Sequence, residues 1–147
     1  PSTTALVLPG TGEDFALFTL LTNGVNTNCA TTGDSILIHF ESPLGTFNGT
    51  VPLLVGQVYA PGAHPGSSFP GLQINISATP AAFVIFDGNQ MGGIFGPLTL
   101  PLSGITLQGT VPVNVAGTNV IIQALALTPT AANGFFATSV ARELRFY

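Results

Sequence analysis

The chain has 147 residues, of which 46% are hydrophobic and 5% are charged, and its formal net charge is −4 at pH 7. Arg142 and Arg145 are its two basic residues, too few to provide the basic surface that nucleic acids and anionic lipid surfaces require. No run approaches the roughly 20 apolar residues of a membrane-spanning helix. We therefore expect one folded domain over residues 1–147 that binds no nucleic acid and does not insert into a membrane.

Short apolar runs follow one another along the whole chain. In chain order, strands are expected at residues 4–8, 15–21, 35–41, 51–59, 72–77, 83–86, 105–111, 120–127 and 144–147. Runs such as 35–41 and 72–77 alternate apolar and polar residues, which is typical of half-buried antiparallel strands. Runs 51–59 and 120–127 are apolar on both faces, which is typical of strands inside a sandwich or beneath a partner.

Glycine and proline separate these runs. Pairs such as Asn48-Gly49 and Asn133-Gly134 indicate tight turns. No amphipathic helix of ten residues fits, because Pro129 interrupts the stretch 124–132, which is rich in Ala and Leu. Nine or ten short strands with regularly spaced turns predict an all-β fold, an antiparallel β-sandwich of jelly-roll-like type.

The sequence shows no recognisable catalytic apparatus. His39 and His64 are the two histidines. His39 shares a strand face with Glu41, and solvated neighbours on a strand explain that pair better than catalysis does. No pair of carboxylates is marked out for glycoside hydrolysis, and no zinc, phosphate-loop or dinucleotide motif occurs. We therefore expect that this chain is not an enzyme.

Calcium is the one cofactor that the sequence suggests. Glu13, Asp14 and Asp34 bound a region that also contains several Asn residues, and oxygen ligands from loops suit Ca²⁺. Capping of turns by the same side chains is the alternative interpretation. We name Asp14 and Asp34 as candidate calcium ligands.

A structural ion pair is expected near the end of the chain. Strand alternation places Arg142 on the same face as Leu144 and Phe146. A guanidinium on a core face requires a carboxylate or several carbonyl groups. We expect Arg142 to be partly buried and paired with Asp14 or Glu13.

Three further residues have open roles. Cys29 is the one cysteine. It is either a small buried side chain or a thiol available for an intermolecular bond. Asn48 and Asn75 each begin an Asn-X-Ser/Thr pattern, which is the acceptor for N-glycosylation.

Two segments carry a resemblance to known proteins. Residues 12–17 with 23–26, and more specifically residues 123–139 (QALALTPTAANGFFATS), resemble secreted low-charge β-domains of planctomycete-type environmental bacteria. The resemblance runs from about Gly12 to the end of the chain. It implies export and a β fold, and it assigns no activity and no site residues.

The first functional hypothesis is a structural subunit of an extracellular or cell-surface filament, sheath or layer. The chain begins at Pro1 without Met, which we interpret as a processed, secreted form. Native sheets usually protect their edges with Lys or inward-facing charges, and this chain has no Lys. Copies are expected to polymerise through strand edges, with residues 1–11 as a possible donor-strand arm. The assembly residues are Thr4, Ala5, Leu6, Val7 and Leu8.

The alternative is a carbohydrate- or ligand-binding β-sandwich module. Such modules stack sugars on exposed aromatic rings, but Trp, the usual stacking residue, is absent, and the chain has two Tyr, Tyr59 and Tyr147. The 11 Phe residues are better explained as core, because Phe lacks a polar group.

Overall fold

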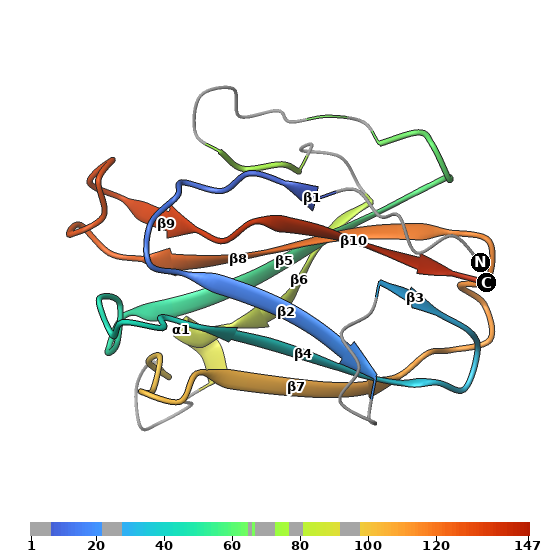
Figure 1. Cartoon of the computed structure of the whole chain (residues 1–147), viewed down its shortest axis with the longest axis horizontal. Helices are drawn as coiled ribbons and strands as arrows, with labels where there is room; N and C mark the ends of the chain where they lie inside the picture. The colour runs from blue at the N-terminus through green and yellow to red at the C-terminus, as the bar shows by residue number, and fades with distance from the viewer. Residues whose placement is uncertain (1–6, 22–27, 65, 67–72, 77–80, 92–97) are drawn as a thin grey trace.

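Figure 1 shows a computed structural model of the chain, which describes residues 7–21, 28–64, 66, 73–76, 81–91 and 98–147. Within these ranges the chain forms ten strands and one four-residue helix. In order they are β1 (Val7–Leu8), β2 (Ala16–Leu21), β3 (Cys29–Ala30), β4 (Ser35–Glu41), β5 (Val51–Tyr59), β6 (Ala82–Asp87), α1 (Gly88–Met91), β7 (Ile105–Thr110), β8 (Asn119–Leu127), β9 (Phe136–Thr138) and β10 (Ala141–Phe146).

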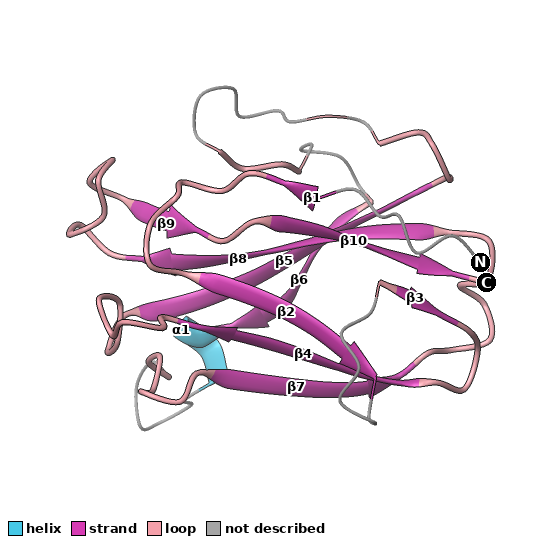
Figure 2. Ribbon diagram, viewed as in Figure 1, coloured by secondary structure: helices cyan, strands magenta, loops and turns pink. Residues whose placement is uncertain are grey.

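Two sheets pack face to face (Figure 2). The larger sheet has the strand order β1-β10-β8-β5-β6, with β3 beside β10 and β9 beside β8, and the smaller sheet has the order β2-β4-β7. The pairs are antiparallel except for β3 with β10, which run parallel. The chain changes sheet at each step from β1 to β5, and again from β6 to β7 and from β7 to β8. The predicted antiparallel β-sandwich of about ten short strands is confirmed.

The hydrophobic core fills the space between the sheets. Phe40 of β4 is fully buried, and its ring lies edge-on to Phe15 at 6.4 Å and to Phe86 at 5.9 Å between centroids. Ile122 and Leu144 meet this cluster from β8 and β10 of the larger sheet. Each such side chain contributes about 1.5–3 kcal/mol when fully buried, so the alternation of apolar residues along the strands determines which faces meet.

A second layer covers the outer face of the larger sheet. Ile74 and Ile76, from the segment 73–76, pack on Tyr59 and Ile121 there. Strand β8 is therefore buried on both faces, as its two-sided apolar pattern predicted, with only Leu127 partly exposed.

The strand expected at residues 72–77 is corrected in its described part, because residues 73–76 form no ladder strand. The side-chain amide of Gln123 forms hydrogen bonds with the backbone of this segment, in place of the bonds that a neighbouring strand would form. Its Oε1 accepts from Asn75 N–H at 2.9 Å, and its Nε2 donates to Gln73 O at 2.8 Å. The alternation of that run still predicted correctly that Ile74 and Ile76 turn toward the protein.

Short elements differ most from the sequence-based expectations. Strands β3 and β9 were not expected, because two or three residues are too few for an alternation pattern. Of the strand expected at residues 4–8, the described part is β1. No helix in the described ranges is long and apolar enough to cross a membrane.

Candidate functional site

Strand β6 forms an open edge of the larger sheet. Among the described residues it pairs with β5 alone. Leu54 lies opposite Phe86 and Val55 opposite Val84, so Ile85 is an extra residue that forms a β-bulge. The strand carries no charged side chain before Asp87, and Phe83 and Val84 are 42% and 57% exposed. An apolar edge of this kind is a template for pairing with another strand.

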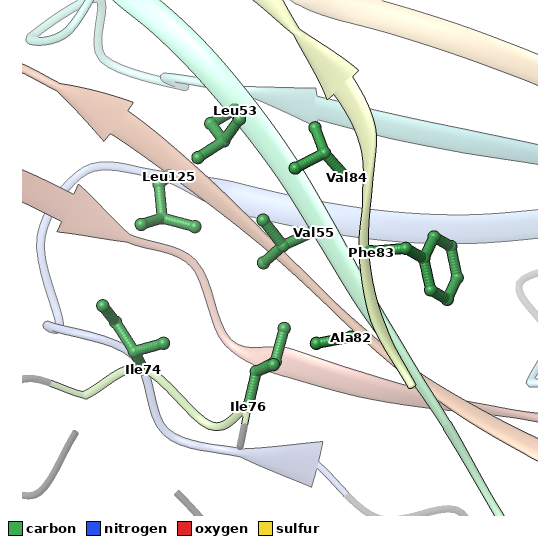
Figure 3. Close-up of a pocket in the computed structure, with 8 residues that line it drawn as sticks. All are labelled: Leu53, Val55, Ile74, Ile76, Ala82, Phe83, Val84 and Leu125. Atoms are coloured by element: carbon green, nitrogen blue, oxygen red, sulfur yellow. The ribbon is translucent and has the colours of Figure 1, made fainter. Parts of the chain in front are cut away.

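An apolar cavity of about 290 Å³ lies on the outer face of β6 (Figure 3). Its walls are Leu53 and Val55 of β5, Val84 of β6, and Ile74 and Ile76 of the covering segment. In Figure 3, Val84 turns toward Leu53 and Val55, whereas the ring of Phe83 lies on the other side of the β6 ribbon. Phe83 and Val84 thus leave β6 on opposite sides, although Phe83 also contributes to the lining of this cavity.

A second apolar cavity, of about 300 Å³, lies between the two sheets. Phe83 and Ile85 of β6 line one side, and residues at the end of β7, including Val111 just beyond it, line the other. Val120, Ile122 and Leu144 also line it, and all three belong to the central core. In the described part of the chain β7 is the outer strand of the smaller sheet, so the sandwich opens to its core between two strand edges.

Gly56 makes room for the aromatic side of this edge. A Cβ atom at Gly56 would lie 3.0 Å from Phe83 Cζ and 3.2 Å from Ile85 Cδ1, which is tighter than ordinary contact. The missing side chain lets the Phe83 ring lie across β5. Among the described residues that line the two cavities, none carries a charge.

A polar cluster occupies a different part of the larger sheet. Glu143 of β10 is 4% exposed, and its carboxylate accepts hydrogen bonds from the Tyr59 hydroxyl and from Arg145 Nε, the latter at 2.6 Å. Burial and the hydrogen bond to Glu143 raise the pKa of Tyr59 far above its usual value, and the hydrogen bond to Glu143 also raises the pKa of Arg145. The ring of His64 lies edge-on to Tyr59, 5.2 Å away.

The sequence-based search for sites missed Glu143, although a signal was present. Glu143, Arg145 and Tyr147 share one strand face, and an acid two residues from an arginine on one face can form a pair. What the sequence did not show is that Tyr59, from β5, completes the cluster.

Asp14 has a structural role at a turn. Its carboxylate accepts from Ser42 Oγ at 2.6 Å and from the N–H groups of Leu44 and Thr46, each at 3.1 Å to Oδ2. Burial alone would raise the pKa of Asp14, but these hydrogen bonds outweigh it and lower the pKa to about 2. N–H and O–H donors already surround the oxygens that were named as calcium ligands.

Asp34 lies in a separate turn, where its Oδ2 accepts from Thr31 N at 2.8 Å and from Thr31 Oγ1 at 3.2 Å. Within the described ranges no three His, Cys, Asp or Glu residues come together as a metal-binding group. The structure does not test calcium binding. The turn-capping interpretation accounts for the contacts of both Asp14 and Asp34, and it is the one on which we base our prediction for calcium.

The ion pair predicted between Arg142 and Asp14 is corrected. Arg142 is partly buried on the core side of β10, as predicted. Its Nε donates to Leu17 O of β2 at 2.7 Å, and its guanidinium carbon lies 6.0 Å from the centre of the Phe18 ring. Neither Asp14 nor Glu13 forms an ion pair with it. The carboxylate of Asp14 binds the turn at residues 42–46 instead, and the backbone carbonyl of Leu17 in β2 accepts the hydrogen bond from Arg142.

The described part of the predicted donor arm is bound to its own domain. Val7 and Leu8 pair with Arg142 and Ala141 of β10. Further along, Thr11 N donates to Thr138 Oγ1 at 3.0 Å, and Thr138 N donates back to Thr11 Oγ1 at 3.1 Å. Residues 7–11 are therefore not a free arm, and Thr4, Ala5 and Leu6 lie outside the described residues.

The remaining candidates are located as follows. His39 Nε2 lies 3.4 Å from Glu41 Oε2, which confirms that the two side chains share a face. Cys29 is half-buried in β3. Asn75 Nδ2 donates to Pro9 O at 2.9 Å, and Asn48 lies in the turn before β5, where Asn48 N donates to Gly45 O.

Comparisons with known proteins give little. No family model matches the sequence, and no curated protein is similar to it, so the resemblance to planctomycete-type domains stays a prediction. One similar solved structure is a cellulose-active polysaccharide monooxygenase from M. thermophila, with 14% identity and a TM-score of 0.43. The match covers 81% of this chain and 53% of that chain, so the chain spans about half the length of that protein.

This comparison corrects one expectation. We expected that the chain is not an enzyme, and similarity to an enzyme contradicts that expectation, which we withdraw. At this level of identity and structural overlap the likeness supplies no activity to replace it.

Proposed function

We propose that this chain is a structural subunit of an extracellular assembly, and that its copies join edge to edge at β6. The observation that carries the proposal is the pair of apolar cavities on either face of an edge strand that pairs with β5 alone among the described residues.

Strand addition explains why a cavity lies on each face. A strand placed beside β6 would direct alternate side chains to opposite faces of the sheet. One set would enter the cavity beside Val84, and the other would enter the cavity beside Phe83. In this mode of recognition backbone hydrogen bonds give affinity, and pockets for alternate side chains give specificity.

A second copy of this chain is the occupant that we favour. The cavity linings carry no charge among the described residues, so the added strand must be apolar on both faces. Strand β6 meets that requirement itself, with Phe83 and Ile85 facing the core side and Val84 facing the outer side. Two copies of β6 running antiparallel would form a two-fold contact in which each edge covers the other.

Edge protection argues in the same direction. Natural sheets blunt their edges with Lys, inward charges, Pro or bulges. Strand β6 has the bulge at Ile85 but no charge before Asp87. The bulge twists the edge and limits the number of residues that can pair with a second strand. We therefore expect a contact between short strands and not a long continuous ladder.

The strength of a single contact is modest. Phe83 and Val84 are about half exposed, so burying them in both copies contributes a few kcal/mol at about 1.5–3 kcal/mol per fully buried side chain. Association costs about 4–15 kcal/mol in lost freedom of motion. The two side chains alone do not offset that cost, so the backbone hydrogen bonds between the two edges must supply the remainder. We expect concentration-dependent pairing, and growth into a filament, sheath or layer requires a second contact elsewhere on the surface.

Sedimentation velocity over a range of concentrations tests this proposal. We expect the unmodified chain to associate and Val84→Lys to remain monomeric, because a charge would have to be buried in the contact. Val113→Lys is the matched control, since Val113 is 81% exposed and lines neither β6 cavity. Circular dichroism verifies that both variants are folded.

Two results would overturn the proposal. One is an unmodified chain that stays monomeric at the highest concentration that remains clear. The other is an equal effect of the lysine at positions 84 and 113. Capture of an unrelated apolar peptide by a monomeric chain would assign the edge to another partner.

A further inference from the structure

A small cavity of about 200 Å³ lies at the end of β10, away from the outer cavity at β6. It is formed where the ends of three neighbouring strands of the larger sheet meet. Arg145, Phe146 and Tyr147 line it from the last residues of the chain, and Asn119 lines it from the start of β8. Pro61 and Gly62, just after β5, and Gly117, just before β8, complete the wall.

Hydrogen bonds to buried residues orient the Arg145 side chain that lines this cavity. Arg145 Nε donates to Glu143 at 2.6 Å, and Glu143 is in turn hydrogen-bonded by Tyr59. Asn119 is 4% exposed and lies between the other two strands, directly opposite Arg145 of β10 and Tyr59 of β5. A guanidinium whose Nε is anchored this way has a restricted orientation. Arg145 also interacts with Tyr147, which adds to the rise in the pKa of Arg145.

The pairing of Arg145 with Glu143 favours a neutral ligand over an anionic one. Glu143 compensates the charge of Arg145 within the protein. An anionic ligand would therefore meet an arginine that is already paired and a buried carboxylate behind it. A neutral ligand can accept hydrogen bonds from Arg145 and can both donate to and accept from the amide of Asn119. It is not repelled by the buried carboxylate of Glu143.

Tyr147 is the one tyrosine among the described residues that line this cavity. Tyr147 is 47% exposed, whereas Tyr59 is 8% exposed and is used in the cluster beneath. A half-exposed tyrosine offers a flat apolar face together with a polar hydroxyl. Ligand sites usually combine such apolar walls with a few placed polar groups.

We propose that this cavity binds a neutral sugar residue of a glycan, with Tyr147 against the ring face and with Arg145 and Asn119 on the hydroxyl groups. A pyranose ring has one face of C–H groups and a rim of hydroxyls, and the residues that line the cavity include both an aromatic side chain and polar side chains. The site does not include Val84 or Phe83, so it operates independently of edge pairing at β6.

Isothermal titration with neutral sugars tests the site on the full chain. The probes are glucose, galactose, mannose and N-acetylglucosamine with their β-linked tetrasaccharides, and a tetragalacturonate serves as the anionic probe. We expect one neutral series to bind saturably at concentrations up to about 10 mM. Tyr147→Ala should weaken that binding at least about tenfold, and Tyr147→Phe should retain most of it.

Phe135→Ala is the matched control, because Phe135 is 74% exposed and does not line the cavity. It should leave sugar binding unchanged. Arg145→Lys should also weaken binding, and urea unfolding separates that loss from a loss of folding. Absence of saturable binding by every neutral probe overturns the proposal. So does binding that Tyr147→Ala leaves intact, or binding of the tetragalacturonate alone.

Discussion

Tyr59 and Glu143 are 84 positions apart in the sequence, and the tyrosine hydroxyl donates a hydrogen bond to the buried glutamate. The bond crosses from β5 to β10 over the intervening β8, on the outer face of the larger sheet. Arg145 satisfies the other carboxylate oxygen at 2.6 Å. This cluster links β5 and β10, the two strands that flank β8, and it orients Arg145 at the cavity near the end of β10.

Glu143→Gln should destabilise the fold by about 1–3 kcal/mol, because the buried carboxylate loses its charge-assisted hydrogen bonds from Tyr59 and Arg145. Urea unfolding gives the free energy. Glu41→Gln is the control, since the Glu41–His39 pair lies at a partly exposed position, and pairs of that kind contribute about 0–1 kcal/mol. Equal losses for the two variants would show that the Glu143 cluster contributes no more to stability than a partly exposed pair does.

Asp14→Asn should cost about 1 kcal/mol at neutral pH, because an amide accepts fewer of the N–H hydrogen bonds from Leu44 and Thr46. The effect should depend on pH with a definite sign. The folded pKa is lowered to about 2 from 3.8, so the stabilisation is present above pH 3.8 and is lost as the pH falls toward 2. Urea midpoints measured across this range should converge for Asp14→Asn and the unmodified chain. Parallel curves would contradict the assignment.

Calcium should leave the unfolding temperature unchanged, because the oxygens of Asp14 and Asp34 already accept hydrogen bonds from N–H and O–H donors. A ligand that binds only the folded state must raise that temperature. Differential scanning calorimetry with added calcium and with a chelator measures the effect. A calcium-dependent increase that disappears in Asp14→Asn would restore the site expected from the sequence.

Gly10→Ala should destabilise the docking of β1 by about 1–3 kcal/mol. A Cβ atom there would lie 2.3 Å from Ser139 O, which requires the backbone to move. Gly109→Ala is the control, because a Cβ at Gly109 meets nothing within 4 Å and lies on an exposed strand. Amide hydrogen exchange in β1 and β10 reports the local change. Unchanged protection in Gly10→Ala would mean that residues 7–11 hold less firmly than the contacts indicate.

The sequence by itself determined the class of fold. Alternation along residues 35–41 and two-sided apolar runs such as 120–127 are local properties, and they predicted the half-buried strand β4 and the central strand β8. Strands of two or three residues, such as β3 and β9, carry no periodic signal, and they formed because β10 and β8 present backbone groups to them.

Only the tertiary structure decided which residues meet. Asp14 and Arg142 had suitable charges for a pair, but Asp14 found donors in the turn at residues 42–46 and Arg142 found Leu17 O. The cluster of Glu143, Tyr59 and Arg145 and the cavities beside β6 depend on strand order and register. Pairing between strands is non-local, so composition and spacing fix the faces of each strand, while its neighbours are fixed only when the sheets assemble.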